Sequence, residues 1–170
     1  MPVYQNDIKV SIPREVTRTA AGEAFTAFVV EVAALGHFVT AAGESLARHG
    51  GQSLARWVVL DAVSARPATV SQVARVRRMA RQPVQRIAEA LVADGLAVFE
   101  PNPRHRRAHL LTLTPAGREV HHAISVRQKA WADAHGAKIG TETLERARAL
   151  ISELRPQIAM PEPPPPRDGA

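Results

Sequence analysis

The stretch that decides the fold runs from Thr69 to Val120 and reads TVSQVARVRRMARQPVQRIAEALVADGLAVFEPNPRHRRAHLLTLTPAGREV. Thr69 and Gln72 form a capping box, because each can satisfy a free backbone N–H of the other, and this predicts a helix that begins at Val70. A break near Arg78 separates that helix from a second one. The opening of the stretch therefore predicts two consecutive helices with a tight turn between them.

The second of these helices has two chemically different faces. It tolerates Pro83 because that residue lies in its first turn, and Asp94 with Gly95 ends it. Its apolar residues share one face and its polar residues share the other, so one face is expected to pack and the other to face solvent. The apolar set is Val84, Ile87, Ala88 and Leu91, and the polar set is Gln82, Gln85, Arg86 and Glu89.

A hairpin and a further helix complete the stretch. Residues 96–100 (LAVFE) and 109–114 (HLLTLT) predict two short strands, joined by the basic loop 101–108 (PNPRHRRA). Thr114 before Pro115 is a good helix start, because the hydroxyl can cap and proline suits the first position. A further short helix, residues 54–63, precedes the stretch, and three helices followed by a hairpin are the order of a winged helix.

Long amphipathic helices flank this region. From about residue 15 to 48 the apolar positions alternate between spacings of four and three, which predicts a seam too long for a small core to cover alone. A partner chain is expected to cover part of it. After the hairpin we expect a helix that breaks at Gly136 and a last one from about Thr141, and Val76 is a candidate for the inward face of the helix from Val70.

The predicted fold class is mainly α with a small β-hairpin, a winged helix-turn-helix with dimerisation helices at both ends. We expect an N-terminal arm (1–13), dimerisation helices (14–50 and 114–158), a winged DNA-binding lobe (51–113) and a disordered, proline-rich tail (159–170).

The positive charge is concentrated in one part of the chain. The net charge is +6, yet residues 66–118 alone hold ten arginines and three carboxylates, a net +7. Arginine's planar fork suits phosphates and guanine edges. The concentration favours a polyanionic partner, and the alternative is a basic surface that serves only solubility.

Several classes of function are disfavoured by what the sequence lacks. Without cysteine there is no disulfide or thiolate zinc site, and the seven histidines have no metal-ligand spacing, so no metal or cofactor is expected. No glycine-rich phosphate loop or paired nucleophile indicates an enzyme. No apolar run approaches the roughly 20 residues of a membrane span and the start does not resemble a secretory signal, so we expect a cytoplasmic protein.

An ordered set of motifs resembles the DNA-binding core of the MarR (multiple antibiotic resistance regulator) family. The pieces are Thr69 to Ala74, then Leu91 with Gly95-Leu96, the wing residues His105-Arg106-Arg107, and residues 113–117, LTPAG. The family usually has Asp where this chain has His105, so the pairing that orients the wing arginine is missing; the wing is then looser, or protonated His105 adds charge. Ala80 also stands where a capping residue is common.

The resemblance implies a role for each polar residue of the stretch. The helix after the turn would enter the major groove and place Arg81, Gln82, Gln85 and Arg86 against base edges. Phosphates would be held by Thr69, Ser71, Arg77 and Arg78, and the wing would contact the backbone or minor groove through Arg104, Arg106 and Arg107. Glu89 lies on the same face and is placed at the rim, because a carboxylate would meet phosphate unfavourably.

The resemblance also implies an effector pocket where the first and second helices meet the fifth. His37, Phe38, Arg56 and Trp57 could line it and would suit an aromatic acid or phenol, with ordinary core packing as the alternative. The expected function is a ligand-responsive regulator, chiefly a repressor, that binds a pseudo-palindromic operator on double-stranded DNA as a homodimer. The alternative is a winged-helix module that docks proteins without sequence-specific DNA binding.

Overall fold

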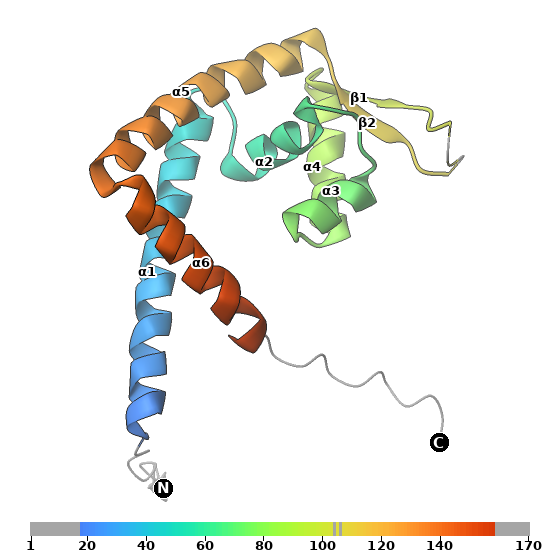
Figure 1. Ribbon diagram of the computed structural model, residues 1–170. Coiled ribbons are helices and arrows are strands. Elements are labelled where there is room, and N and C mark those ends of the chain that lie inside the picture. The colour runs from blue at the N-terminus through green and yellow to red at the C-terminus, as the bar shows by residue number, and fades with distance from the viewer. Residues whose placement is uncertain (1–17, 104, 106, 159–170) are drawn as a thin grey trace, which may run out of the picture. The chain divides into compact units, whose positions relative to one another are not determined.

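The computed structural model describes residues 18–103, 105 and 107–158, and it is mainly helical with a two-strand antiparallel wing, which confirms the predicted fold class (Figure 1). Two compact units divide the chain, Met1–Gly43 and Glu44–Ala170. The elements in chain order are α1 (Ala20–Arg48), α2 (Leu54–Ser64), α3 (Val70–Arg77), α4 (Arg81–Ala93), β1 (Ala97–Glu100), β2 (Leu110–Leu113), α5 (Pro115–Ile139) and α6 (Thr141–Ile158).

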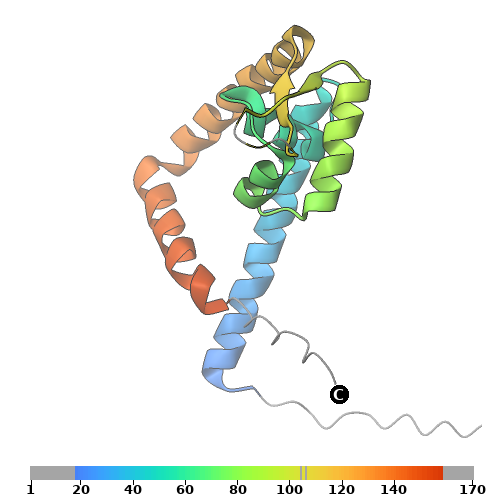
Figure 2. The same cartoon turned by 90° about the vertical axis from the view of Figure 1, so that its right-hand side faces the viewer.

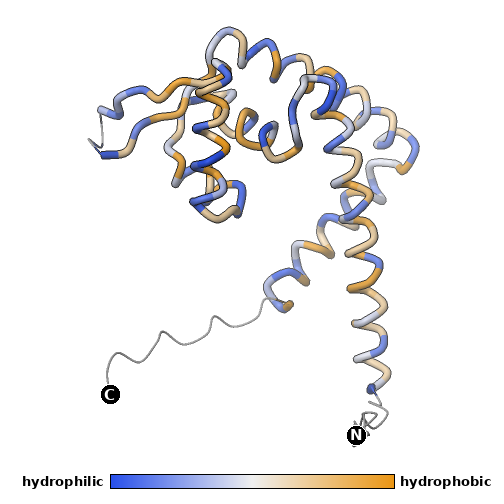
Figure 3. The backbone as a smooth tube through the Cα atoms, turned by 180° about the vertical axis from the view of Figure 1, so that it is seen from behind, coloured by the Kyte–Doolittle hydropathy of each residue, from blue (hydrophilic) through white to orange (hydrophobic). Residues whose placement is uncertain are grey.

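The first unit consists, in its described part, of α1 up to Gly43. By length and composition alone α1 could cross a membrane, with a mean hydropathy of 1.6 over an 18-residue window. The expectation that no segment approaches that length is therefore wrong for this helix, because Val, Phe, Leu and Ala are frequent in it and charged residues are few. Hydrophobic residues recur along α1 (Figure 3). Their side chains are largely exposed in the single chain, including Leu35 at 57% and Phe38 at 71%.

The second unit contains the winged lobe, α2 to β2 (residues 54–113), around one apolar core. Leu60 of α2, Val73 of α3, Leu91 of α4 and Leu111 of β2 are all almost completely buried within it. Val76 is 68% exposed, so its assignment to the inward face of α3 is wrong. The core fixes which face of α4 can look outward.

The hairpin is tied both to the lobe and to the start of α5. Ala97 pairs with Leu113 and Glu100 with Leu110, and Ala68 adds a bridge to Leu111 on the other side of β2. Gly117 is buried in the first turn of α5, where a Cβ would lie 1.9 Å from the carbonyl oxygen of Leu96. Glycine is therefore required at this close approach of α5 to the hairpin.

Two helix boundaries test the sequence signals around α5. Thr114 caps the helix and accepts a hydrogen bond from the N–H of Gly117 at 3.1 Å, with Pro115 at the first position, as predicted. The predicted break at Gly136 is wrong, because the helix continues through it to Ile139 and ends at Gly140, which has φ 90°. An interior glycine costs a helix only about 1 kcal/mol, which packing elsewhere can offset.

α6 follows α5 after Gly140 within the same unit (Figure 2). None of its residues is buried. Its larger apolar side chains are exposed in the single chain: Leu144 at 41%, Leu150 at 58%, Ile151 at 46% and Ile158 at 42%. Like α1, α6 carries an apolar surface that its own unit does not cover.

Candidate nucleic-acid interface

α3 begins with the predicted capping box. The Thr69 hydroxyl accepts from the N–H of Gln72 at 3.2 Å, and the side-chain oxygen Oε1 of Gln72 accepts from the N–H of Thr69 at 2.8 Å. Val70 is buried directly after the cap, whereas Ser71 is exposed. The box thus fixes where α3 starts and leaves Ser71 on its outer surface near the N-terminus, the end at which free N–H groups favour phosphate.

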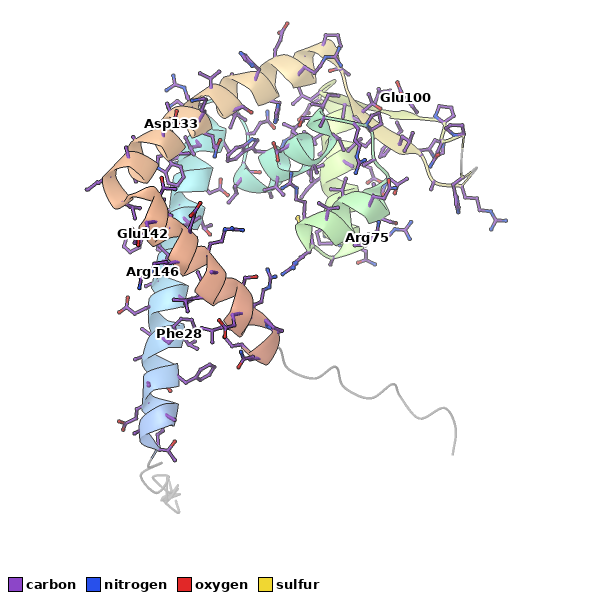
Figure 4. All side chains as sticks on the ribbon, viewed as in Figure 1. Phe28, Arg75, Glu100, Asp133, Glu142 and Arg146 are labelled. Atoms are coloured by element: carbon purple, nitrogen blue, oxygen red, sulfur yellow. The ribbon has the colours of Figure 1, made fainter. Side chains whose placement is uncertain are left out.

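The turn between α3 and α4 depends on a left-handed residue. Arg78 has φ 53° and ψ 42°, and its N–H donates to the carbonyls of Ala74 and Arg75 at the end of α3. A side chain in this conformation costs about 1 kcal/mol relative to glycine. Arg75 and Arg78 are both exposed at the end of α3, and Arg75 is labelled in Figure 4.

α4 presents its polar face outward. Val84, Ala88 and Leu91 are completely buried on one side, so the opposite side must face away from the core. There Arg81, Gln82, Arg86 and Glu89 are exposed and Gln85 is half-buried. Ala80 gives the helix no side-chain cap, as the sequence predicts, so its first N–H groups stay available at this surface.

One hydrogen bond orders this outer face of α4. The Gln85 side-chain nitrogen Nε2 donates to Oε1 of Glu89, one turn later, at 2.8 Å. The described structure gives Arg81, Gln82 and Arg86 no side-chain hydrogen bond or ion pair. Arg81, Gln82 and Arg86 are therefore available for other partners, whereas the amide of Gln85 is hydrogen-bonded to Glu89.

The wing is a short hairpin with a polar tip. Thr112 donates to Glu100 across the strands at 3.1 Å, and the N–H of Ala108 donates to the His105 carbonyl in the connecting turn. Arg107 is exposed at the tip. The predicted wing residues Arg104 and Arg106 lie outside the described residues. The described tip therefore offers one arginine, and Glu100, labelled in Figure 4, is the last residue of β1 before the loop.

The structure places Arg77 differently from the other predicted phosphate ligands. Its guanidinium pairs with Asp61 of α2, and Asp61 also accepts from Nε2–H of His121 of α5 at 3.0 Å. Only 31% of the Arg77 side chain is exposed, and its Nε is buried without a partner. Arg77 would have to leave this pair, or share it, to hold a phosphate.

This three-residue cluster was missed by sequence reasoning. It joins α2, α3 and α5 through residues that lie far apart in the chain. The one available signal was Asp61 itself, a carboxylate in the apolar run WVVLDAV, which is seldom placed in such a run without a partner.

A cavity of about 320 Å³ lies beside the cluster, lined by Trp57, Val58, Asp61, Arg77, Ser125 and Gln128. Of the four predicted effector-pocket residues, Trp57 alone lines it. Arg56 is paired elsewhere, with Asp94 at 2.5 Å and with Gln52 at 2.6 Å. His37 and Phe38 are neighbours on α1 in the first unit, with ring centroids 6.2 Å apart.

Comparisons with known proteins agree with this geometry. The family model described as "MarR family" matches residues 51–108. An uncharacterized protein of Mycobacterium tuberculosis is 44% identical over 99 residues, which cover 58% of this chain and 69% of that protein.

Three solved structures share the fold. A MarR family transcription regulator has a TM-score of 0.71 at 24% identity, covering 79% of this chain and 90% of its own. MepR of Staphylococcus aureus, solved with DNA, has 0.69 at 12%, covering 78% and 98%. MarR of Staphylococcus aureus, solved with salicylate and kanamycin, has 0.64 at 18%, covering 79% and 89%. A basic winged lobe with an outward polar helix, a matching family model and these relatives lead to one conclusion: the chain belongs to the MarR family of winged-helix DNA-binding transcriptional regulators, which are not enzymes.

Proposed function

We propose that this protein is a cytoplasmic, homodimeric repressor that binds a pseudo-palindromic operator and releases it when a small aromatic or phenolic effector binds. The observation that carries the proposal is the outer face of α4. It holds Arg81, Gln82 and Arg86 exposed and uncommitted, while Val84 and Leu91 of the same helix are buried in the core. Long polar side chains without internal partners are available for base edges and phosphates.

Base reading is assigned to α4 and positioning to its surroundings. Arg86 and Arg81 can each donate two hydrogen bonds to guanine, and Gln82 and Gln85 can pair with adenine. Thr69 and Ser71 at the start of α3 and Arg78 in the α3–α4 turn would hold phosphates, with Arg77 joining them if its pair with Asp61 opens. Arg107, with Arg104 and Arg106, would contact the backbone or the minor groove through the wing.

The dimer is proposed from the two apolar helices. Leu35 and Phe38 of α1 are more than half exposed in the single chain, and so is Leu150 of α6. Exposed apolar rows of this length are normally covered in a soluble protein, and a second copy supplies a matching surface. Two copies would present two α4 helices to successive major grooves, which requires a pseudo-palindromic operator.

The effector response is proposed from the cavity beside Asp61. A volume of about 320 Å³ is at the lower end for a small-molecule site and suits a single-ring compound beside Trp57. The MarR structure solved with salicylate supports this ligand class. A ligand that prefers one arrangement of α2, α3 and α5 would change DNA affinity by its difference in affinity for the two arrangements.

The test compares two arginines with different roles. An operator is selected from random DNA, and affinities are measured by fluorescence anisotropy over a range of salt concentrations. Arg86→Ala should weaken operator binding by about tenfold or more and relax sequence choice, because a bidentate base contact is lost. Arg107→Ala should weaken all sequences alike and reduce the salt slope by about 1, because a phosphate contact is lost.

Arg146→Ala on α6 is the matched control, since it removes the same charge outside the winged lobe (Figure 4). It should leave sequence choice unchanged. Unchanged binding in both Arg86→Ala and Arg107→Ala would refute the assignment. A wild-type protein without salt-dependent, sequence-selective binding would instead fit a winged-helix module that docks other proteins.

A further inference from the structure

We propose that Glu89 is a positioning residue that presets Gln85 to read adenine in the major groove. The inference rests on the proposed function, because it requires α4 to enter that groove. Its basis is the hydrogen bond from Nε2 of Gln85 to Oε1 of Glu89, 2.8 Å long and one helical turn apart. Glu89 was expected only to avoid phosphate at the rim of the interface, and this bond gives it a direct effect on a base-reading side chain.

The chemistry of the pair leaves one orientation for the amide. An ionised carboxylate can only accept hydrogen bonds, whereas a glutamine amide has a nitrogen that donates and an oxygen that accepts. The side of the amide that faces Glu89 must therefore be the nitrogen. Without Glu89, the amide could turn over by 180° at little cost, and the same side chain would present the opposite pattern to DNA.

The groups that remain free on Gln85 match adenine. One N–H is committed to Glu89, so one N–H and the carbonyl oxygen are left, a donor beside an acceptor. Adenine shows the complementary pattern in the major groove, with N7 as acceptor and the N6 amino group as donor. Guanine shows two acceptors, N7 and O6, and would require two donors on the same edge. The held amide therefore favours adenine over guanine at its base pair.

The partner choice of Glu89 also frees Arg86. Arg86 lies three residues before Glu89, a spacing at which an arginine and a glutamate commonly pair on a helix. No ion pair joins them in the described structure, and Arg86 is exposed. By holding Gln85 instead, Glu89 fixes one reading residue and leaves the neighbouring guanidinium available. Two adjacent residues can thus discriminate between different bases.

The experiment measures discrimination at one base pair. The Gln85-dependent base pair is first located as the operator position whose adenine-to-guanine preference is lost in Gln85→Ala. At that position the ratio of affinities for the adenine and guanine operators is then compared among wild type, Glu89→Asp, Glu89→Gln and Glu89→Ala. The aspartate carboxylate can only accept a hydrogen bond, the glutamine amide can offer Gln85 either a donor or an acceptor, and alanine offers neither. Circular dichroism melting checks that each variant is folded.

The expected result separates acceptor chemistry from size and charge. Glu89→Asp should keep the wild-type ratio, and Glu89→Gln and Glu89→Ala should each lower it about threefold, in keeping with the modest strength of an exposed side-chain pair. An operator with 7-deazaadenine at this position lacks the N7 acceptor. The difference in affinity between wild type and Glu89→Ala should be smaller on this operator than on the adenine operator. Loss of the negative charge should raise affinity for all sequences alike, since that effect acts through phosphates.

A double variant tests whether Glu89 acts through the amide of Gln85. In the Gln85→Ala background, Glu89→Ala should leave the ratio unchanged, because there is no amide to orient. If wild type is selective but the ratio ignores Glu89→Gln, or if no base pair depends on Gln85, the role of Glu89 is overturned and the proposed function stands. If wild type shows no selective DNA binding, both fail together.

Discussion

The winged lobe and the terminal helices treat their apolar residues in opposite ways. In the lobe, Leu60, Val84, Leu91 and Leu111 are each completely buried. In α6 no residue is buried, and along α1 Leu35 is 57% exposed. The elements of the lobe bury one another's apolar side chains, whereas the apolar side chains of α1 and α6 stay largely exposed in the single chain.

The lobe is stabilised within one chain, whereas the terminal helices depend on a second surface. The lobe closes its own core with three helices and a hairpin, and its stability should not depend on protein concentration. The terminal helices have periodic apolar rows that one chain leaves open, so their order should depend on association. Substitutions in the lobe core, in α1 and in the Asp61 cluster should therefore have different effects.

Leu60→Ala should have the largest effect. The side chain is completely buried in the lobe core, and its truncation should lower the free energy of unfolding by about 3 kcal/mol. Urea denaturation at two protein concentrations measures the loss, which should be the same at both. Val76→Ala, at a position 68% exposed, is the control and should change stability by less than about 0.5 kcal/mol. Similar losses in the two variants would contradict the described core.

Leu35→Ala should act on association instead. Removing an apolar side chain from a dimer interface should weaken the dimer by about 2 kcal/mol, or about thirtyfold in dissociation constant. Sedimentation equilibrium measures the constant, and Glu31→Ala on the same helix is the polar control. A dissociation constant that does not respond to Leu35→Ala would remove this part of α1 from the interface.

Asp61→Asn should have the smallest effect of the three. It removes the negative charge shared by Arg77 and His121, but Asp61 is 44% exposed and solvent screens the pair. We expect a loss of about 1 kcal/mol in the free energy of unfolding, smaller at high salt. Asp133→Asn, which disrupts an exposed pair with Lys129, is the matched control and should cost less. Equal losses would mean that the cluster does not link α2, α3 and α5.

Local signals were enough to predict most of the fold. Thr69 with Gln72 located the start of α3, and Thr114 with Pro115 located the start of α5, because a cap depends on residues a few positions apart. The predicted helix break at Gly136 was wrong because glycine only weakens a helix. Gly140, in contrast, adopts a positive φ, and α5 ends there. The helical spacing of the apolar residues also distinguished the two faces of α4.

The pairing of distant side chains could not be predicted in the same way. Asp61 and Arg77 are 16 residues apart, and Asp61 and His121 are 60 apart, so only the packing of α2 against α3 and α5 brings them together. The amide of Gln85 was read as a free base contact, because spacing alone does not say which of several neighbours a side chain binds. The roles of these residues on DNA stay predictions.

The close approach at Gly117 has a mechanical consequence. A Cβ there would overlap the Leu96 carbonyl, and Thr114 and Arg118 donate to the carbonyls of Gly95 and Leu113 on either side of it. The first turn of α5 and the root of the hairpin are thus clamped without room for slippage. We therefore expect the hairpin to follow a rotation of this end of α5, with Arg107 at its tip displaced farther than the helix itself.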